Sequence, residues 1–373
     1  MAAGTPETTS VHANTSIMQG GGAYNETAVV QMTLVDYTKT LLHTQLDRYI
    51  TTLPSTLHAL TVRIADLGAS EGRNSVALLS TVLGYLESRL PSSMEREYFV
   101  MHEDQPDNDF ASLLSTLRAP TSYVQSTPNV YTSVIAKSFY ERLLPSSSVD
   151  IVVSYISLHW MSAIPMPLPG NYMTLNAPTR AALPDVCAAW AAASHRDWVH
   201  FLRLRATELV DNGAMCLTMA GFADHAVQVA WADVVPKALV ECVRLGCLSQ
   251  ASMDKMTLGA YLRTCNEVRA GVAEVPDWEL HECQMIDMPI LVPTAKAGAA
   301  FMVATTTPSI VSVMTPDERN NSVFHATLAA QLEKQFERNV TMDGVTKPLY
   351  ALLEMRYLYC ALTRKPRTAS MKA

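Results

Sequence analysis

Apolar residues recur at helical spacing early in the chain and later gather into short runs separated by turn residues. Residues 28–49, AVVQMTLVDYTKTLLHTQLDRY, repeat apolar positions every three or four residues, which predicts an amphipathic helix. The run LTVRIADL then leads into a turn with two glycines, and a second helix is predicted over Val76–Glu87. The pattern therefore indicates a strand, a tight turn and a helix in succession.

Further apolar runs alternate with helical stretches along the chain. REYFVMHED, SVDIVVSYI and GAMCLTMAG predict buried strands, and a long helix is predicted before the last of them, through Asp197–Leu209. PILVP and AAFMVATTT are predicted to be late strands. Strands that alternate with helices at this spacing predict an α/β fold with a mostly parallel, doubly wound sheet.

Two stretches do not follow this alternation. Residues 166–194 are rich in Pro and then in Ala, and residues 222–284 are predicted to be largely helical. We expect both to form an α-helical cap over the mouth of the sheet. The predicted division is a Rossmann-like core with an N-terminal loop over residues 1–165, 195–221 and 285–373, and a substrate-covering cap over 166–194 and 222–284.

Composition narrows the classes of partner. The 373 residues are 49% hydrophobic with a formal net charge of −7, which argues against a nucleic-acid-binding face. The start of the chain resembles no secretory signal, and no apolar stretch of about 18 residues predicts a membrane span. The seven cysteines are scattered and contain no zinc-like spacing, so we expect reduced thiols, no metal site and a cytoplasmic protein.

The first candidate site is the turn DLGASEG, residues 66–72. Ligands of doubly wound sheets bind at the carboxyl ends of the strands, where this turn is predicted to lie. Gly68 and Gly72 allow a close approach of backbone to ligand, but the dinucleotide fingerprint needs a third glycine. Asp66 before the turn suits a cofactor with cationic or hydroxyl groups and no phosphate there, such as S-adenosylmethionine. The alternative is a glycine turn without chemical meaning.

Two other strand ends carry candidate residues. Asp104 follows the second predicted strand, where a carboxylate accepts hydrogen bonds from a ribose diol; the alternative is a solvated acidic loop. Trp160 follows the third, in SLHWMSAIP, and its indole N–H only donates, which suits a carboxylate partner. The alternative is a core tryptophan bonded to a backbone carbonyl.

Together these residues resemble the SABATH family of S-adenosylmethionine-dependent small-molecule methyltransferases. MQGGGAYNETAVVQ is similar to the family's MNGG…SYAxNSxxQ, IADLGASEGRNS to IADLGCSSGPNT, and DQPDNDF to DLPxNDF. KSFYERLLPSSSVD resembles GSFYxRLFPxxSxD, SLHWMSAIP resembles SLHWLSxVP, FLRLRATELVDNGAM resembles FLxxRxxELVxGGxM, and AYLRTCNEV is weakly similar to PxYxPSxxEV. The resemblance implies a class I methyltransferase fold, Rossmann-like, in a homodimer.

Position by position, the resemblance also implies roles for individual residues. S-adenosylmethionine, which leaves as S-adenosylhomocysteine, would be bound by Tyr24, Asp66, Gly68, Asp104, Ser138 and Phe139. Gln31 and Trp160 would hold the substrate carboxylate and serve catalysis by orienting it, with His159 beside Trp160 in the substrate pocket. Some family members carry magnesium near the active site, and its ligands have no clear match in this sequence.

Several positions depart from the family pattern. Ala28 replaces a serine that contacts the cofactor, and Ile156 replaces a cofactor-contacting tyrosine, with Tyr155 one place earlier and hence on the opposite face of a strand. Gln105 replaces a leucine, and Ser70-Glu71 replaces a pair of serines. These departures indicate a divergent member.

The resemblance and the residues favour one function and leave two open. The favoured function is methyl transfer to the carboxylate of a small acid, which gives a methyl ester. The alternatives are N-methylation of a heterocyclic nitrogen and binding of small molecules without catalysis. A nicotinamide oxidoreductase is disfavoured because the third glycine is missing.

Overall fold

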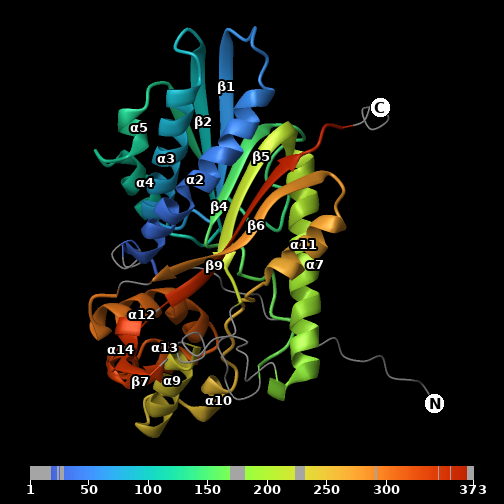
Figure 1. Ribbon diagram of the computed structural model, residues 1–373. Helices are drawn as coiled ribbons and strands as arrows, with labels where there is room; N and C mark the ends of the chain where they lie inside the picture. Colours follow the sequence, from blue (N-terminus) through green and yellow to red (C-terminus); the bar gives the residue numbers. More distant parts are fainter. Residues whose placement is uncertain are drawn as a thin grey trace, which may run out of the picture.

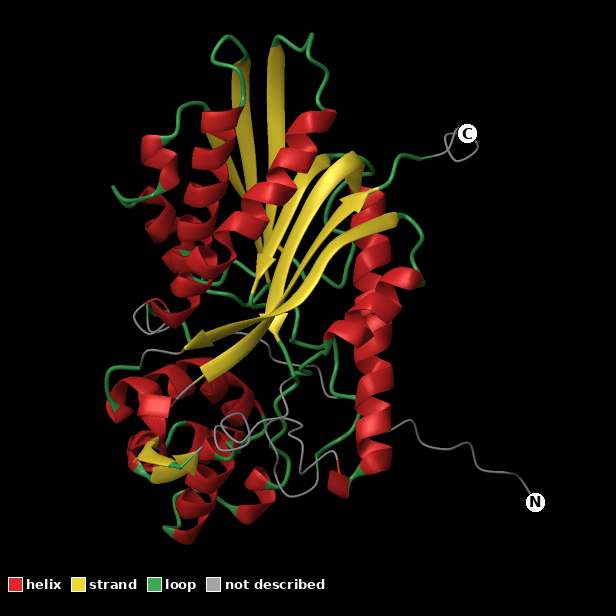
Figure 2. Ribbon diagram, in the orientation of Figure 1, coloured by secondary structure: helices red, strands yellow, loops and turns green. Residues whose placement is uncertain are grey.

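The computed structural model describes residues 18–22, 25, 29–168, 181–222, 232–289, 292–342, 344–352 and 354–367. Its centre is a seven-stranded sheet of order β3-β2-β1-β4-β5-β9-β6 (Figures 1 and 2). The strands are β1 (Ala59–Leu67), β2 (Glu95–Asp104), β3 (Val130–Ala136), β4 (Val149–Tyr155), β5 (Leu209–Ala220), β6 (Trp278–Pro289) and β9 (Glu354–Arg364). β9 alone runs in the direction opposite to the other strands of this sheet, so the predicted mostly parallel α/β fold is confirmed.

Helices cover both faces of the sheet (Figure 1). One face carries α2 (Val29–Thr52), α3 (Arg73–Arg89), α4 (Phe110–Arg118) and α5 (Tyr123–Ser126), and the other carries α7 (Pro184–Glu208) and α11 (Cys265–Ala273). An apolar core fills each interface, with Leu42 and Leu79 on the first face and Trp198 and Phe201 on the second. The helices predicted over residues 28–49 and 76–87 are confirmed, and the one predicted from Asp197 begins earlier, at Pro184.

A separate group of helices lies at the end of the sheet toward which β4 runs (Figure 2). This helical layer contains α9 (Val234–Arg244), α10 (Gln250–Met253), α12 (Ala295–Ser312), α13 (Pro316–Arg319) and α14 (Ser322–Glu337). The short hairpin β7 (Asn339–Met342) and β8 (Val345–Pro348) and the 3-10 turn η1 (Leu349–Leu352) follow it. Its apolar core includes Met302, Phe324 and Phe336, and Trp160 joins that core from the sheet side.

One of the two late strand predictions is wrong, and the other is tested only in part. AAFMVATTT lies inside α12, where an apolar helix packs into the core of the helical layer and burial overrides the preference of Val and Thr for strands. PILVP begins at the last residue of β6, and residues 290–291 lie outside the described part. β6 begins inside the stretch predicted to be helical, over residues 278–284, because an edge strand alternates polar and apolar residues instead of forming an apolar run.

The observed elements also cross the predicted boundary at residue 284. That boundary falls within β6, which is a strand of the sheet, whereas α12–α14 pack with α9 in the helical layer although the core was predicted to resume at residue 285. β3 was not predicted, since its side chains are mostly half-buried or exposed. No helix of the described residues is long and apolar enough to cross a membrane.

Candidate functional site

The carboxyl ends of β1, β2 and β4 meet at one edge of the sheet. Asp66 pairs with His102 on one side and Val153 on the other. The backbone N–H of Gly68 donates to the carbonyl of Glu103 at 2.9 Å. Gly68 has φ +85°, and a Cβ there would lie 2.1 Å from the Ser157 hydroxyl oxygen, so only glycine fits where the β1 turn and the end of β4 approach each other.

Asp104 lies at this edge and shapes the turn after β1. Its Oδ2 accepts a 2.6 Å hydrogen bond from the Ser70 backbone N–H, and its Oδ1 accepts one of 2.8 Å from Gln105. Loss of water around the carboxyl raises the pKa of Asp104 to about 6, and the two N–H donors oppose that rise. The carboxyl is therefore ionised at neutral pH and protonated under mildly acidic conditions.

Asp66 is buried at the head of a chain of hydrogen bonds. The Ser75 hydroxyl donates to Asp66 Oδ2 and lies 2.9 Å from His102 Nδ1, while His102 Nε2 lies 2.7 Å from the Tyr123 hydroxyl. Burial lowers the pKa of His102 to about 4, so the ring is neutral and the chain runs from Tyr123 to Asp66 with a proton on Nδ1. Burial also raises the pKa of Asp66 to about 7.

A third acid at the edge, Glu103, was not found from the sequence. Its Oε2 accepts from the Gly68 N–H at 3.1 Å, and its Oε1 is buried without a hydrogen-bond partner among the described residues. Burial, and then the charge of Asp104, raises the pKa of Glu103 well above its usual range. Three acids and an unused acceptor fit a ligand with hydroxyl and cationic groups, such as S-adenosylmethionine, better than one with phosphates.

Glu71 ties the N-terminal segment to the β1 turn. Its two carboxylate oxygens accept from the backbone N–H groups of Gly22 (2.7 Å) and Asn25 (2.9 Å), and its carbonyl accepts from the Asn25 side chain (3.0 Å). Glu71 is 1% exposed. From the sequence it stood out only as a departure from the family's serine, since its partners lie more than forty residues earlier.

The same N-terminal segment contacts the helical layer. Pro308, inside α12, has no N–H for the carbonyl of Ala304 four residues before it. The backbone N–H of Gln19 donates to that carbonyl at 3.0 Å. Gln19, Gly22 and Asn25 are therefore held by the β1 turn through Glu71 and by α12 through Ala304.

The loop after β4 places His159 and Trp160 between the sheet and the helical layer. Ile156 has φ +61°, a strained conformation for a β-branched residue, so β4 ends abruptly at Tyr155. Trp160 is 9% exposed, its carbonyl accepts from the Tyr140 hydroxyl at 2.7 Å, and its indole N–H makes no hydrogen bond within the described part of the chain. The ring of His159 lies 5.2 Å from that of Trp160.

His159 is neutral in this loop. Its Nδ1 is buried and has no hydrogen-bond partner among the residues the structure describes. Desolvation, and then the charge of Arg263, lowers the pKa of His159 to about 3. The loop thus holds two polar groups, the Trp160 indole N–H and His159 Nδ1, that no described side chain satisfies.

The remaining predicted site residues lie on other elements, after β3 and at the start of α2, or outside the described residues. Ser138 and Phe139 follow β3, next to Lys137, whose backbone N–H donates to the Asp104 carbonyl at 3.0 Å. Phe139 is buried against Tyr140. Gln31 lies in the first turn of α2. Tyr24 and Ala28 lie outside the described residues, so the predicted role of Tyr24 stays a prediction, as do the ligand contacts of the others.

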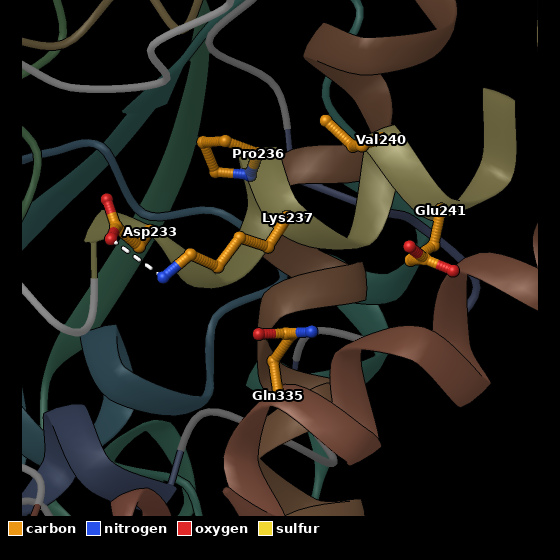
Figure 3. A pocket seen from close by; sticks show the side chains of 6 residues that line it. All are labelled: Asp233, Pro236, Lys237, Val240, Glu241 and Gln335. Carbon is orange, nitrogen blue, oxygen red and sulfur yellow. Dashed lines mark hydrogen bonds and ion pairs between the residues drawn. The ribbon is translucent and has the colours of Figure 1, made fainter. Parts of the chain in front are cut away.

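Two further features of the structure bear on the site. Within the described ranges, no group of three His, Cys, Asp or Glu residues is arranged to hold a metal ion. A cavity of about 330 Å³ lies elsewhere, between α9 and α14, lined by Asp233, Pro236, Lys237, Val240, Glu241 and Gln335 (Figure 3). An ion pair of 3.0 Å joins Asp233 and Lys237 at its side, and none of the predicted site residues lines it.

Comparison with known proteins places the chain in a family. The family model for SAM-dependent carboxyl methyltransferases matches residues 12–360. O-methyltransferase acrG of Aspergillus aculeatus is 32% identical over 232 residues, which cover 59% of this chain and 58% of acrG. A benzoic acid/salicylic acid carboxyl methyltransferase of Petunia hybrida is 28% identical over 67% of this chain and 72% of its own length.

The solved structures add the fold. A loganic acid methyltransferase solved with SAH, S-adenosylhomocysteine, superposes with a TM-score of 0.77 at 18% identity, over 94% of this chain and 99% of that one. This likeness confirms the class I methyltransferase architecture. Because the family model spans nearly the whole chain, the protein belongs to the SAM-dependent carboxyl methyltransferase family, the SABATH family, with S-adenosylmethionine as its methyl donor.

Proposed function

We propose that this protein transfers the methyl group of S-adenosylmethionine to a carboxylate oxygen of a small organic acid. A new O–C bond forms as the S–C bond breaks, its electron pair stays on sulfur, and the products are a methyl ester and S-adenosylhomocysteine. No proton moves, because a carboxylic acid with a pKa near 4 is already ionised at neutral pH. The chain therefore has to position and desolvate its ligands.

The observation that carries this proposal is that the indole N–H of Trp160 has no hydrogen-bond partner among the described residues. A donor-only group that no described residue satisfies, in a loop at the edge of the sheet, suits an acceptor-only ligand such as a carboxylate. Gln31, on α2, is the second proposed donor. The neutral ring of His159 is no general base in this scheme, and its role is to line the pocket.

The methyl donor, S-adenosylmethionine, would be held at the neighbouring strand ends. We assign the ribose hydroxyls to Asp104, the methionine end to the turn of Asp66 and Gly68, and the adenine to the segment of Ser138 and Phe139. Asp104 and Ser138 belong to one stretch of this edge because the Lys137 N–H bonds to the Asp104 carbonyl. We also propose a homodimer in the cytoplasm, and no step of this scheme requires magnesium.

The first experiment titrates S-adenosylmethionine and S-adenosylhomocysteine by calorimetry and then assays methyl transfer to benzoate, salicylate, jasmonate, gibberellate and, as the alternative class, purine-type heterocycles. Micromolar cofactor binding with methyl ester formation supports the proposal. Turnover of the heterocycles alone would replace it with N-methylation. Cofactor binding without any turnover would favour a binding protein.

The second experiment replaces Trp160 by Phe. The variant keeps the apolar ring in the core of the helical layer and removes the N–H, so KM for the acid should rise about 10- to 150-fold, the equivalent of one hydrogen bond to a charged group. The Kd of S-adenosylhomocysteine should stay the same. An unchanged KM would show that Trp160 does not hold the carboxylate.

A further inference from the structure

Arg263 lies directly behind the loop that carries His159 and Trp160. It is 2% exposed, and its own segment pairs with that loop: the Tyr261 N–H donates to the His159 carbonyl at 2.8 Å, and Ala260 forms a β-bridge with Trp160. On its other side Arg263 bridges Gly221, just after β5. The guanidinium is thus built into the wall of the candidate acceptor site.

The contacts of this guanidinium are with neutral groups. Its Nη atoms donate to the carbonyls of Leu158 and Ser194, the latter at 3.0 Å, and one Nη lies 3.9 Å from the Met219 sulfur. Its central carbon lies 6.0 Å from the Trp198 ring centroid. Arg263 forms no ion pair with a carboxylate in the part of the chain that the structure describes, and its Nε is buried without a partner.

A second buried arginine has the carboxylate partner that buried arginines usually have. Arg205, also fully buried on the same side of the sheet, pairs its Nε with a carboxylate oxygen of Glu208 at 2.8 Å. A buried charge without a counter-ion costs several kcal/mol, because dipoles replace its hydration only in part. Arg263 therefore leaves a positive potential beside the site loop that the described residues do not neutralise.

We propose that Arg263 is the specificity-determining residue that makes the acceptor site select anions. The carboxylate of the acceptor supplies the counter-charge that Arg263 lacks among the described residues, acting across the loop through the positive potential and the indole N–H donor of Trp160. This inference rests on the proposed function and deepens it. By this inference an acid, but not a neutral heterocycle, lowers the free-energy cost of burying the charge of Arg263.

A kinetic signature separates this role from a structural one. During methyl transfer the acceptor loses its negative charge, so a fixed positive charge stabilises the bound acid more than the transition state. It also repels the cationic donor. Removal of the charge should therefore raise KM for the acid about tenfold while kcat and donor affinity stay equal or improve. Structural damage would lower kcat and donor affinity as well.

The test compares Arg263→Gln, which removes the charge, with Arg263→Lys, which keeps it. Binding of an acid and of its neutral amide, for example benzoate and benzamide or the corresponding pair for the best acid of the wild-type panel, is measured with S-adenosylhomocysteine bound. We expect Arg263→Gln to weaken binding of the acid about tenfold and leave that of the amide unchanged, and Arg263→Lys to restore most of the preference. Circular dichroism checks that both variants fold.

The matched control is Arg269→Gln. Arg269 follows six residues later and also donates to a backbone carbonyl, that of Cys283 at 2.7 Å, but it lies exposed on α11. Its replacement should change the binding of neither the acid nor the amide. The proposal is overturned if Arg263→Gln weakens binding of the acid and of the amide equally, or if Arg263→Lys does not restore the preference for the acid. In either case the proposed activity of the wild type on acids would still stand. A wild-type protein that binds amide and acid equally overturns both proposals at once.

Discussion

The ionisation of Asp104 decides how well its carboxyl accepts hydrogen bonds from a ribose. With a pKa of about 6 it is charged at neutral pH, and it already accepts from the Ser70 and Gln105 backbone. We predict that Asp104→Asn weakens S-adenosylhomocysteine binding by about 1–3 kcal/mol at pH 7.5. Calorimetry measures the Kd.

The pH dependence provides the control for this prediction. Below pH 6 the wild-type carboxyl takes up a proton and loses its charge, so its Kd should rise toward that of Asp104→Asn, and the two should converge near pH 5. If the Kd of S-adenosylhomocysteine changes with pH in the same way for wild type and variant, Asp104 does not bind the cofactor through its charge.

The buried carboxyl of Asp66 lowers the free energy of unfolding of the protein without ligand. Its pKa is about 7 when folded, against 3.8 for the ordinary group, because its carboxyl is buried. At low pH the group is protonated in both states and costs nothing. As pH rises from about 4 to 7 the unfolded chain ionises first, so the folded state loses stability across this window and has lost the full amount above it.

Replacement of Asp66 by Asn should therefore stabilise the protein without ligand as pH rises. We expect a gain of roughly 2–4 kcal/mol in the free energy of unfolding at pH 8 and almost none at pH 4, together with weaker cofactor binding. Urea denaturation at several pH values measures the gain. A difference that does not depend on pH would show that Asp66 is not the titrating group.

At the scale of elements, Glu71 connects the N-terminal segment to the turn between β1 and α3. Each carboxylate oxygen accepts one backbone N–H, so Glu71→Gln replaces one acceptor by a donor and leaves one N–H unsatisfied. We predict that the amides of Gly22 and Asn25 exchange with deuterium about 5- to 150-fold faster, the equivalent of about 1–3 kcal/mol. Mass spectrometry of the peptide that covers them measures the rate.

Asp107→Asn is the matched control for this variant. Asp107 is an exposed acid in the nearby loop after β2, and none of the described hydrogen bonds involves its carboxyl. Its variant should exchange like wild type. Equal rates in Glu71→Gln and wild type would mean that the segment is held by other contacts, such as the one between Gln19 and Ala304.

Element by element, the sequence predicted what depends on local pattern. β1, β2, β4 and β5 are apolar runs because they are buried on both faces, and their polar ends locate Asp66 and Asp104. α12 was mistaken for a strand because its helical state depends on packing against α14. Glu71 and Arg263 were missed as functional residues, since what marks them is a partner, or the lack of one, that only the folded chain reveals.

At the scale of the whole molecule, ligand binding links the sheet edge to global stability. A ligand at 100 times its Kd stabilises the folded state by about 2.7 kcal/mol. We predict that S-adenosylhomocysteine at this excess raises Tm by several degrees and that NAD, with its two phosphates, does not. Differential scanning fluorimetry tests both, and an equal shift with NAD would contradict the assignment of the acidic edge.

The position of β9 has a consequence for synthesis of the protein. This strand lies between β5 and β6 in the sheet, yet the ribosome makes it after both, and after the whole helical layer. While β9 is still being translated, β5 has an unpaired edge and β6 has no partner in the sheet. Such edges are sites for aggregation. The edges of β5 and β6 therefore stay unpaired in the nascent chain until β9 has been synthesised. Chaperones that bind exposed strands should matter most in that interval.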